Sequence, residues 1–346
     1  MSSTFNINAF RNTIGTTVHS MPIVILYVTE ACNLQCAMCS YRSRLPNELS
    51  LDEIRTLAIS LKEFGLQHIV FSGGEPLLRI DFPQICELFK GLGIRQTLLT
   101  NGLLIAKRVN DLPEYFSEIV VSLDGADAAT HNLIRGVESF DQILKGITVW
   151  RAVPERPSLS IRSVIQKQNF RQISALVDLA VSAGADRISF LSADVHSEAF
   201  GREHGQEVIA QDSIALDQSD VKEFRAIVGR MVASRKDDFG RIISDPPRKL
   251  FHLVEYYEAI LGLSPFPRNR CNAPMVSTVI TSTGAVHPCF FLPTFGNIRQ
   301  DSLPDLLNRN EVLATRTSVR DYTLDHCRKC VCTLYSSPTA AFKNKF

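Results

Sequence analysis

The sequence predicts an α/β protein: a parallel sheet with helices in its connections, followed by a small cysteine-rich segment at the carboxyl end. Short apolar runs alternate with amphipathic stretches through the first half of the chain, and this alternation is typical of βαβ units. Five of the nine cysteines follow residue 270. We therefore expect one large domain with an appendage, a division that suits a chain of 346 residues.

The apolar runs predict six strands, at 23–28, 68–72, 95–100, 118–123, 158–166 and 187–191. The amphipathic stretches between them predict helices at 51–64, 82–91, 139–151 and 170–183. Ser50 and Glu53 form a capping-box signature at the start of the first helix. Gly65, Gly93 and Gly184 stand where three of the helices should end.

The composition indicates a cytoplasmic enzyme with a large core. The chain is 45% hydrophobic and 21% charged, and its net charge of +1 gives no electrostatic footprint for nucleic acid or for an anionic membrane surface. No apolar run reaches eighteen residues, and the first residues lack the basic-then-apolar order of a signal peptide. In a cytosolic chain of this size, nine cysteines favour metal ligation over disulfides.

Three cysteines follow the first predicted strand, MPIVILYVT. Cys32, Cys36 and Cys39 have C-x3-C-x2-C spacing, which directs all three thiolates at one small volume. A structural zinc site needs four protein ligands, whereas three thiolates can hold three corners of an iron–sulfur cube. The fourth iron of such a cube would be open to another ligand.

A second motif, SGGEP, follows the second predicted strand. Gly73 and Gly74 allow the backbone to approach a ligand closely, and the Glu75 carboxylate beside them can accept a hydrogen bond from an ammonium group. An ordinary strand-to-helix turn explains the same residues, because glycine pairs are common in turns.

Taken together, CNLQCAMC, SGGEP, LLTNG and VVSLDG, spread over roughly residues 20 to 195, resemble the radical S-adenosylmethionine (radical SAM) enzymes. The resemblance implies that the first three cysteines bind a [4Fe–4S] cluster whose open iron is chelated by S-adenosylmethionine. It also implies that Gly73, Gly74 and Glu75 receive the amino end of this cofactor. Met38 departs from the family, which usually has an aromatic residue before the third cysteine.

Two further strand ends resemble cofactor contacts of the same family. Thr100 and Asn101 in TNG, and Ser122 and Asp124 in SLDG, match its ribose and carboxylate contacts, and helix capping or turn chemistry is the alternative. The resemblance implies an open, partial (β/α)6 TIM-like barrel. In parallel barrels the reactive groups lie at the carboxyl ends of the strands, which is where the cysteine loop and these residues fall.

The C-terminal cysteines predict a second metal site. Cys271 and Cys289 flank a predicted β-hairpin, VSTVITSTGAVHP, and Cys327 and Cys330 supply a later C-x2-C pair, so four thiolates can meet. On spacing alone a zinc site fits equally well. The arrangement resembles the SPASM or twitch appendage of radical SAM enzymes, and its shorter twitch form implies one auxiliary [4Fe–4S] cluster held by these four cysteines.

For the remaining cysteines and for two histidines, a functional role and a purely structural role are both considered. Cys332 could replace Cys330 as a ligand, could donate a hydrogen atom to a substrate radical, or could be a spare thiol. Cys86 has helical spacing with apolar neighbours and is predicted to lie in the core. His196 and His204 could form another metal site, with a polar surface loop as the alternative.

Four segments are expected along the chain: an N-terminal extension over 1–20, the barrel core over 21–195, a helical connecting or lid region over 196–265, and the auxiliary cluster domain over 266–346. The connecting region has two predicted helices, around 219–235 and near 248–261, and we expect its first residues to cover the barrel mouth and touch substrate.

The resemblance implies an enzyme that reductively cleaves S-adenosylmethionine to a 5′-deoxyadenosyl radical, which abstracts a hydrogen atom from the substrate. Flavodoxin or ferredoxin would supply the electron, and the outcome would be oxidation or epimerisation. Only thirty-one residues precede Cys32, fewer than a leader-binding segment needs. As in a related aminocyclitol dehydrogenase, this shortness favours a small sugar or cyclitol substrate.

Two alternatives remain open on the sequence. Maturation of a ribosomally made peptide would need a separate leader-binding protein. A non-catalytic iron–sulfur electron-transfer protein would explain the cysteines but not SGGEP or the predicted barrel.

Overall fold

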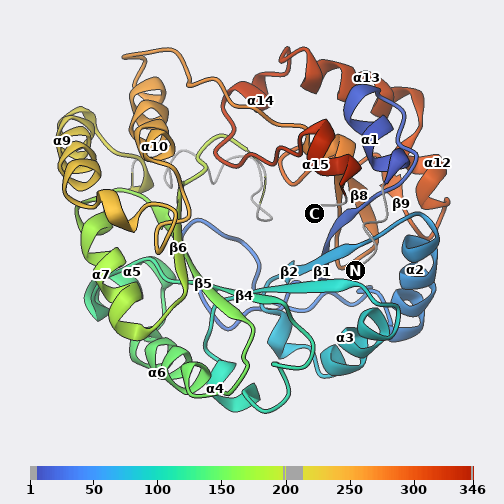
Figure 1. Ribbon diagram of the computed structural model, residues 1–346, viewed down its shortest axis with the longest axis horizontal. Helices are drawn as coiled ribbons and strands as arrows, with labels where there is room; N and C mark the ends of the chain where they lie inside the picture. The colour runs from blue at the N-terminus through green and yellow to red at the C-terminus, as the bar shows by residue number, and fades with distance from the viewer. Residues whose placement is uncertain (1–5, 198, 200–212, 344–345) are drawn as a thin grey trace.

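A curved sheet with helices around its outside forms the body of the molecule (Figure 1). A computed structural model describes residues 6–197, 199, 213–343 and 346. The sheet has nine strands in the order β6-β5-β4-β3-β2-β1-β7-β8-β9. Their bounds are β1 Ile23–Thr29, β2 His68–Gly73, β3 Arg95–Thr100, β4 Glu118–Ser122, β5 Ser158–Ile165, β6 Arg187–Ser192, β7 Ser277–Ile280, β8 Ala285–His287 and β9 Gly296–Asn297.

The first six strands form an open parallel barrel. Each of β1 to β5 pairs in parallel with the next strand in sequence, and β6 does not pair with β1 in the described sheet. The six predicted strands are confirmed, with ends that differ by no more than one residue. The partial-barrel fold is therefore confirmed.

Helices occupy the connections between these strands, as the right-handed crossover of a parallel sheet requires. Their bounds are α2 Leu51–Glu63, α3 Phe82–Gly91, α4 Ile105–Arg108, α5 Ala128–Arg135, α6 Phe140–Arg151 and α7 Ile173–Ala183, the last preceded by a 3-10 turn over Phe170–Gln172. The Ser50 and Glu53 capping box is present, and Gly184 ends α7 with a left-handed φ of 83°. The sequence did not predict α4 or α5.

The predicted C-terminal hairpin is confirmed, but it continues the barrel sheet. β7 pairs in parallel with β1, with Ile23 opposite Ser277, and β8 returns antiparallel to β7. This pairing satisfies the backbone groups along the free edge of β1, which would otherwise be an open sheet edge. The expected boundary near residue 265 thus separates two segments of chain that share one sheet.

Of the two helices of the connecting region, the second packs on β6 and the first packs on the second (Figure 1). These are α9, Gln218–Ser234, and α10, Pro247–Ile260. The hydroxyl of Tyr257 on α10 donates to the Ile165 carbonyl at 2.5 Å and accepts from the Ala193 amide at 3.0 Å, which ties this helix to the ends of β5 and β6. The ring of His196 packs against Phe266, with centroids 5.9 Å apart. His204 and most of the expected substrate-covering segment lie outside the described residues.

The two ends of the chain meet beside the hairpin. Helix α1, Ile7–Ile14, packs on α15, Pro338–Phe342, through a 3.0 Å hydrogen bond from the Asn6 amide to the Phe342 carbonyl. The remaining C-terminal helices are α11 Ala273–Val276, α12 Leu303–Leu307, α13 Asn310–Arg320 and α14 Asp325–Arg328. Arg316 of α13 is fully buried and donates to the carbonyls of Pro274 and Leu307, so it holds three of these helices together.

No helix in the described part of the chain is both long and apolar enough to cross a membrane.

Candidate functional site

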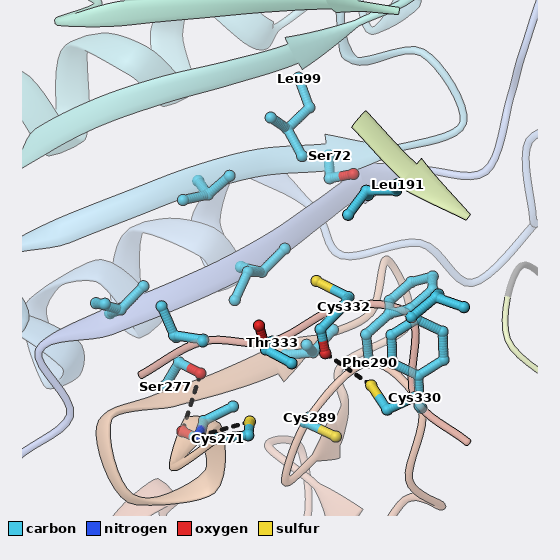
Figure 2. Close-up of a pocket in the computed structure, with 18 of the residues that line it drawn as sticks. Ser72, Leu99, Leu191, Cys271, Ser277, Cys289, Phe290, Cys330, Cys332 and Thr333 are labelled. Carbon is cyan, nitrogen blue, oxygen red and sulfur yellow. Dashed lines mark hydrogen bonds between the residues drawn. The ribbon is translucent and has the colours of Figure 1, made fainter. Parts of the chain in front are cut away.

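Both groups of cysteines open onto one cavity of about 1360 Å3. It lies inside the open barrel. The cysteine loop, Gly73, Gly74, Thr100 and Ser122 line it at the carboxyl ends of the strands, and His68, Arg95 and Glu118 line it at the amino ends. Figure 2 shows Ser72 and Leu99, from β2 and β3, on one side of the cavity, and Cys271, Cys289, Cys330 and Cys332 on the other. The cysteines that line it are Cys32, Cys36, Cys39, Cys271, Cys289, Cys327, Cys330 and Cys332. Cys86 is buried in α3 instead, as predicted.

The loop that carries the first three cysteines is closed by its own backbone. The Cys39 amide donates to the Cys36 carbonyl at 3.2 Å, and the Cys32 amide donates to the Arg42 carbonyl at 3.2 Å. The Arg42 guanidinium donates to the Cys36 carbonyl at 2.9 Å. Burial raises the pKa of the Cys32 and Cys39 thiols. These thiols would lose their protons on binding a metal, since metal coordination favours the thiolate.

The glycine pair of SGGEP lies directly against the start of this loop. The Gly74 amide donates to the Thr29 carbonyl at 2.8 Å, and the Glu75 amide donates to the Ala31 carbonyl at 2.7 Å. A Cβ on Gly74 would lie 2.2 Å from the Ala31 oxygen, and a Cβ on Gly73, whose φ is 125°, would lie 2.2 Å from the Thr29 oxygen. Only glycine permits this approach, because these contacts are with backbone atoms that cannot move aside.

Glu75 does not line the cavity. Its carboxylate is fully buried and accepts hydrogen bonds from the Thr100 hydroxyl at 2.8 Å, the Asn101 amide at 2.7 Å and the Leu77 amide at 3.1 Å. Burial raises the pKa of Glu75 to about 7, although these three donors oppose the shift. The carboxylate therefore joins the ends of β2 and β3 behind the cavity wall, while Gly73 and Gly74 are on the wall itself.

The two TNG residues have different hydrogen-bond partners. Thr100 and Asn101 both line the cavity, but the Thr100 hydroxyl is committed to Glu75. The Asn101 side chain donates to the Asn33 side chain at 2.7 Å and lies 3.9 Å from the Cys32 sulfur. Asn101 therefore couples the end of β3 to the cysteine loop.

The two SLDG residues also lie in different places. Ser122 lines the cavity, whereas Asp124 is completely buried behind it. The Asp124 carboxylate accepts from the Val164 amide at 2.7 Å and forms an ion pair with Arg135 at 2.6 Å. Arg135 in turn donates toward the Cys36 sulfur at 3.7 Å. Asp124 thus reaches the cysteine loop through Arg135.

Tyr27, Arg135 and Arg162 are among the cavity-lining residues that were not predicted as site residues. Tyr27 lies between the two cysteine groups, and its ring packs against those of Tyr41 and Phe290. Arg162 contacts Ser189 at 3.3 Å and has no acidic partner within the part of the chain that the structure describes. None of the three carries a local motif; only their strand or helix register places them there.

The C-terminal cysteines surround the opposite end of the cavity. Burial raises the pKa of the thiols of Cys271, Cys327, Cys289 and Cys330, that of Cys327 to about 11 and that of Cys289 to about 12. The Cys330 thiol donates to the Cys332 carbonyl at 2.7 Å, and Cys332 is exposed. Among the described residues, no three His, Cys, Asp or Glu side chains converge tightly enough to enclose a single metal ion.

An open parallel barrel with a three-cysteine loop at its strand ends defines an iron–sulfur class of protein, and comparison with known families identifies which one. Residues 26–180 match the Radical SAM superfamily, and residues 271–331 match the SPASM iron–sulfur cluster-binding domain. The chain therefore contains a radical SAM domain and a C-terminal SPASM domain. Its cofactors are accordingly a [4Fe–4S] cluster, S-adenosylmethionine and auxiliary iron–sulfur centres. The SPASM match favours iron–sulfur ligation over the zinc alternative.

Relatives with different activities share this sequence pattern. The chain is 34% identical to Fe-coproporphyrin III synthase of Methanosarcina barkeri over 57% of this chain and 49% of that protein, so it spans about half of that relative's length. It is 24% identical to PqqA peptide cyclase of Rhizobium meliloti, over 88% of this chain and 77% of that protein.

Among solved structures, SuiB of Streptococcus suis bound to S-adenosylmethionine has a TM-score of 0.66 and 19% identity, over 95% of this chain and 77% of that one. At this identity the likeness shows a common fold.

Proposed function

We propose that this protein is a radical SAM oxidoreductase that removes a hydrogen atom from a C–H bond of a small organic substrate held between the two cysteine groups. One observation carries the proposal: the first three cysteines and the C-terminal cysteines line the same cavity. A substrate in that cavity would be in reach of both centres.

In this proposal Cys32, Cys36 and Cys39 hold the [4Fe–4S] cluster, and S-adenosylmethionine occupies its open iron. The residues present fit these groups. Three thiols on one loop leave a coordination position free. Beside them the buried Arg135 Nε has no hydrogen-bond partner among the described residues, which supports an anionic sulfur-containing group at this place. When bound, the cluster supplies the electron for reductive cleavage of the sulfonium.

The chain's own residues would bind and orient the cofactor. Gly73 and Gly74 present peptide groups to the cavity without side chains, which supports contact with the amino end of the cofactor. Ser122 and Asn101 also face the cavity and can donate hydrogen bonds there. Glu75 and Asp124 would act from behind the wall, by holding these strand ends in register.

For the second centre we propose one auxiliary [4Fe–4S] cluster with Cys271, Cys289, Cys327 and Cys330 as ligands. Their raised thiol pKa values come from burial, and they support a site that holds thiolates only when iron supplies the positive charge. The rings of Phe290 and Tyr27 both line the cavity and pack together, with centroids 5.7 Å apart, so they would supply an apolar wall beside both centres.

Two features of the cavity, its apolar walls and Arg162, bear on the substrate class. The walls between the two centres are mainly apolar, with Leu99, Val120, Val164 and Leu191 from the strands, so they support a compact organic molecule shielded from water. Arg162, which lacks an acidic partner among the described residues, supports an anionic group on either the cofactor or the substrate. The sugar or cyclitol substrate stays a prediction.

Peptide maturation is a second candidate function. It is favoured by the alignment with PqqA peptide cyclase, which extends over 88% of this chain. Flavodoxin or ferredoxin is the proposed reducing partner in both cases. A cytoplasmic location belongs to the same proposal, because free thiols and iron–sulfur centres suit a reducing compartment.

Release of 5′-deoxyadenosine tests the proposed activity. Anaerobically reconstituted protein is incubated with S-adenosylmethionine and dithionite, with the Cys32, Cys36 and Cys39 triple alanine variant as control. We expect release by the wild type and none by the variant. Equal release by both, or none by the wild type with its iron in place, would overturn the proposal; the latter result is the one that a pure electron-transfer protein gives.

The same reaction distinguishes the outcomes and substrate classes. Candidate sugars, cyclitols and peptides are tested for faster release of 5′-deoxyadenosine. Turnover of a responsive compound in D2O then separates oxidation, which removes hydrogen, from epimerisation, which introduces deuterium from an exchangeable donor.

A further inference from the structure

Arg135 is a buried cation beside a cysteine of the first loop. Its side chain is 13% exposed, and its Nη1 lies 3.7 Å from the Cys36 sulfur. Its Nη2 lies 2.6 Å from the Asp124 carboxylate. The guanidinium group therefore bridges a buried acid and a proposed iron ligand.

Backbone contacts fix Arg135 relative to the cysteine loop. The Gln35 amide, next to Cys36, donates to the Arg135 carbonyl at 3.0 Å. Gly136 ends α5 with a φ of 70°, and a Cβ there would lie 2.3 Å from the Gln35 oxygen. The end of α5 thus packs directly on the cysteine loop, and the backbone of Arg135 is fixed beside that of Cys36.

Asp124 fixes the other side of the guanidinium group. Its carboxylate is held by the Val164 amide at 2.7 Å, and its own carbonyl accepts from the Asn169 side chain at 2.7 Å. These contacts connect Arg135 to β5 and to the turn that follows it. Arg135 is therefore fixed at two places: its backbone contacts the cysteine loop, and its side chain pairs with the buried Asp124.

The environment makes this charge effective. Arg42, which lies just beyond Cys39, is exposed and donates to a carbonyl rather than to sulfur, so solvent screens its charge. Charges interact more strongly where contact with solvent is small, and Arg135 is much less exposed than Arg42. Hydrogen bonds to sulfur, net charge and solvent exposure are the features that set the reduction potential of an iron–sulfur cluster.

We propose that Arg135 raises the reduction potential of the cluster held by Cys32, Cys36 and Cys39. With the cluster bound, the proposed flavodoxin or ferredoxin would supply one electron, and the guanidinium would stabilise the added negative charge through its own charge and its contact with the Cys36 sulfur. Asp124 is a positioning residue that holds the guanidinium in place. This inference rests on the proposed function, since it takes the three cysteines as cluster ligands.

The test is an EPR-monitored redox titration of the reconstituted full-length protein without S-adenosylmethionine. Arg135→Gln removes the charge. Arg162→Gln is the matched control, because Arg162 lines the same cavity but makes no hydrogen bond to a cysteine sulfur among the described residues. The triple alanine variant of Cys32, Cys36 and Cys39 identifies which signal belongs to the auxiliary centre. Iron is counted in each variant.

For Arg135→Gln we expect the equilibrium constant for reduction of this cluster to fall at least tenfold, which is a shift of 59 mV to more negative potential for one electron. The auxiliary signal and the Arg162→Gln variant should keep wild-type potentials. An Arg135→Gln protein with full iron and an unchanged potential would overturn the proposal, as would an equal shift in Arg162→Gln.

If Arg135→Gln loses its iron, Arg135→Lys carries the test. Lysine keeps the positive charge, but its single ammonium group does not match the planar guanidinium that contacts both Asp124 and Cys36. We therefore expect full iron and a smaller shift of the reduction potential to negative values. Full iron with an unchanged potential would assign the effect to the charge alone, and full iron with a higher potential would contradict the proposal. Failure of the proposed function is distinguishable, because the wild type would then show no cluster that depends on the three cysteines.

Discussion

The ring of Tyr27, on β1, packs against the ring of Phe290, which follows Cys289, with 5.7 Å between their centroids. On its other side Tyr27 packs edge-to-face on Tyr41, just beyond Cys39, with centroids 6.0 Å apart. Burial, followed by the nearby Tyr41 and Cys39, raises the pKa of Tyr27 well above its usual range, so its hydroxyl stays protonated. One buried, neutral aromatic residue therefore contacts the segments that carry both groups of cysteines.

This relationship predicts the effect of removing the ring. Tyr27→Ala should leave the iron content near the wild-type value but speed the bleaching of the iron–sulfur absorbance in air, because water and oxygen gain access to the space between the centres. Tyr27→Phe keeps the ring and is the control, with bleaching near the wild-type rate. Identical bleaching of the alanine variant and the wild type would show that this aromatic contact does not shield the centres.

Iron counting tests the assignment of the two centres. The reconstituted wild type should hold about eight irons, falling to about four in the Cys32, Cys36 and Cys39 triple alanine variant, if each site holds a four-iron cube. Cys86→Ala is the control, because Cys86 is buried in the core of α3 and lines no part of the cavity. Zinc at the first loop, or no loss of iron in the triple variant, would contradict the assignment.

Cys330 and Cys332 can be separated by single substitutions. Cys330→Ala should lose auxiliary iron, whereas Cys332→Ala should retain it, because Cys332 is exposed and Cys330 is the more buried of the two. The measurement is iron and sulfide content, with 5′-deoxyadenosine release beside it. Unchanged iron with lost product formation in Cys332→Ala would support a hydrogen-donor role for Cys332. Lost iron would make Cys332 the ligand.

Gly74→Ala should disrupt the first centre alone. The new Cβ would lie 2.2 Å from the Ala31 oxygen and 2.6 Å from the Glu30 oxygen, which would push the SGGEP backbone away from the cysteine loop. We expect a loss of about four irons at the first site and retention of the auxiliary iron. Gly229→Ala is the matched control: it lies in α9, with nothing within 4 Å of its Cβ, and should be stabilising by about 1 kcal/mol.

The raised pKa of Glu75 predicts that the stability of the folded protein depends on pH. Its pKa is raised to about 7 by burial, from 4.5, so between these values the folded state holds a proton that the unfolded state has released. The contribution of Glu75 to the free energy of unfolding is therefore fully present below about pH 4.5 and is lost as the pH rises through 7. The wild-type melting temperature minus that of Glu75→Gln should fall between pH 5 and pH 8. A difference that stays constant or rises would refute this titration.

Much of the barrel could be predicted because its determinants are local. Apolar runs and helical periodicity lie within short segments, and they located the six strands and the helices α2, α3, α6 and α7, but not the short α4 and α5. In a parallel sheet the carboxyl ends of strands share one edge, so the cysteine loop, Gly73, Gly74, Thr100 and Ser122 could be expected together, and all of them line the cavity.

The orientation of particular side chains could not be predicted in this way. Glu75 and Asp124 were expected at the cofactor, but both carboxylates are buried behind the wall and bonded to neighbouring strand ends. A carboxylate next to a glycine pair can point to either side of a strand end, and the choice depends on donors that arrive from other strands. For Glu75 these donors are Thr100 and Asn101, some twenty-five residues farther along.

By itself, the sequence determined an open α/β barrel with a sulfur-rich loop at its strand ends and a cysteine-flanked hairpin after it. Only the tertiary structure decided that β7 would pair with β1, that Tyr27 would contact the segments of both cysteine groups, and that Arg135 would reach Cys36. The physical reason is range: periodicity and spacing act over a few residues, whereas these contacts join segments up to about 260 residues apart and form only when the chain packs as a whole.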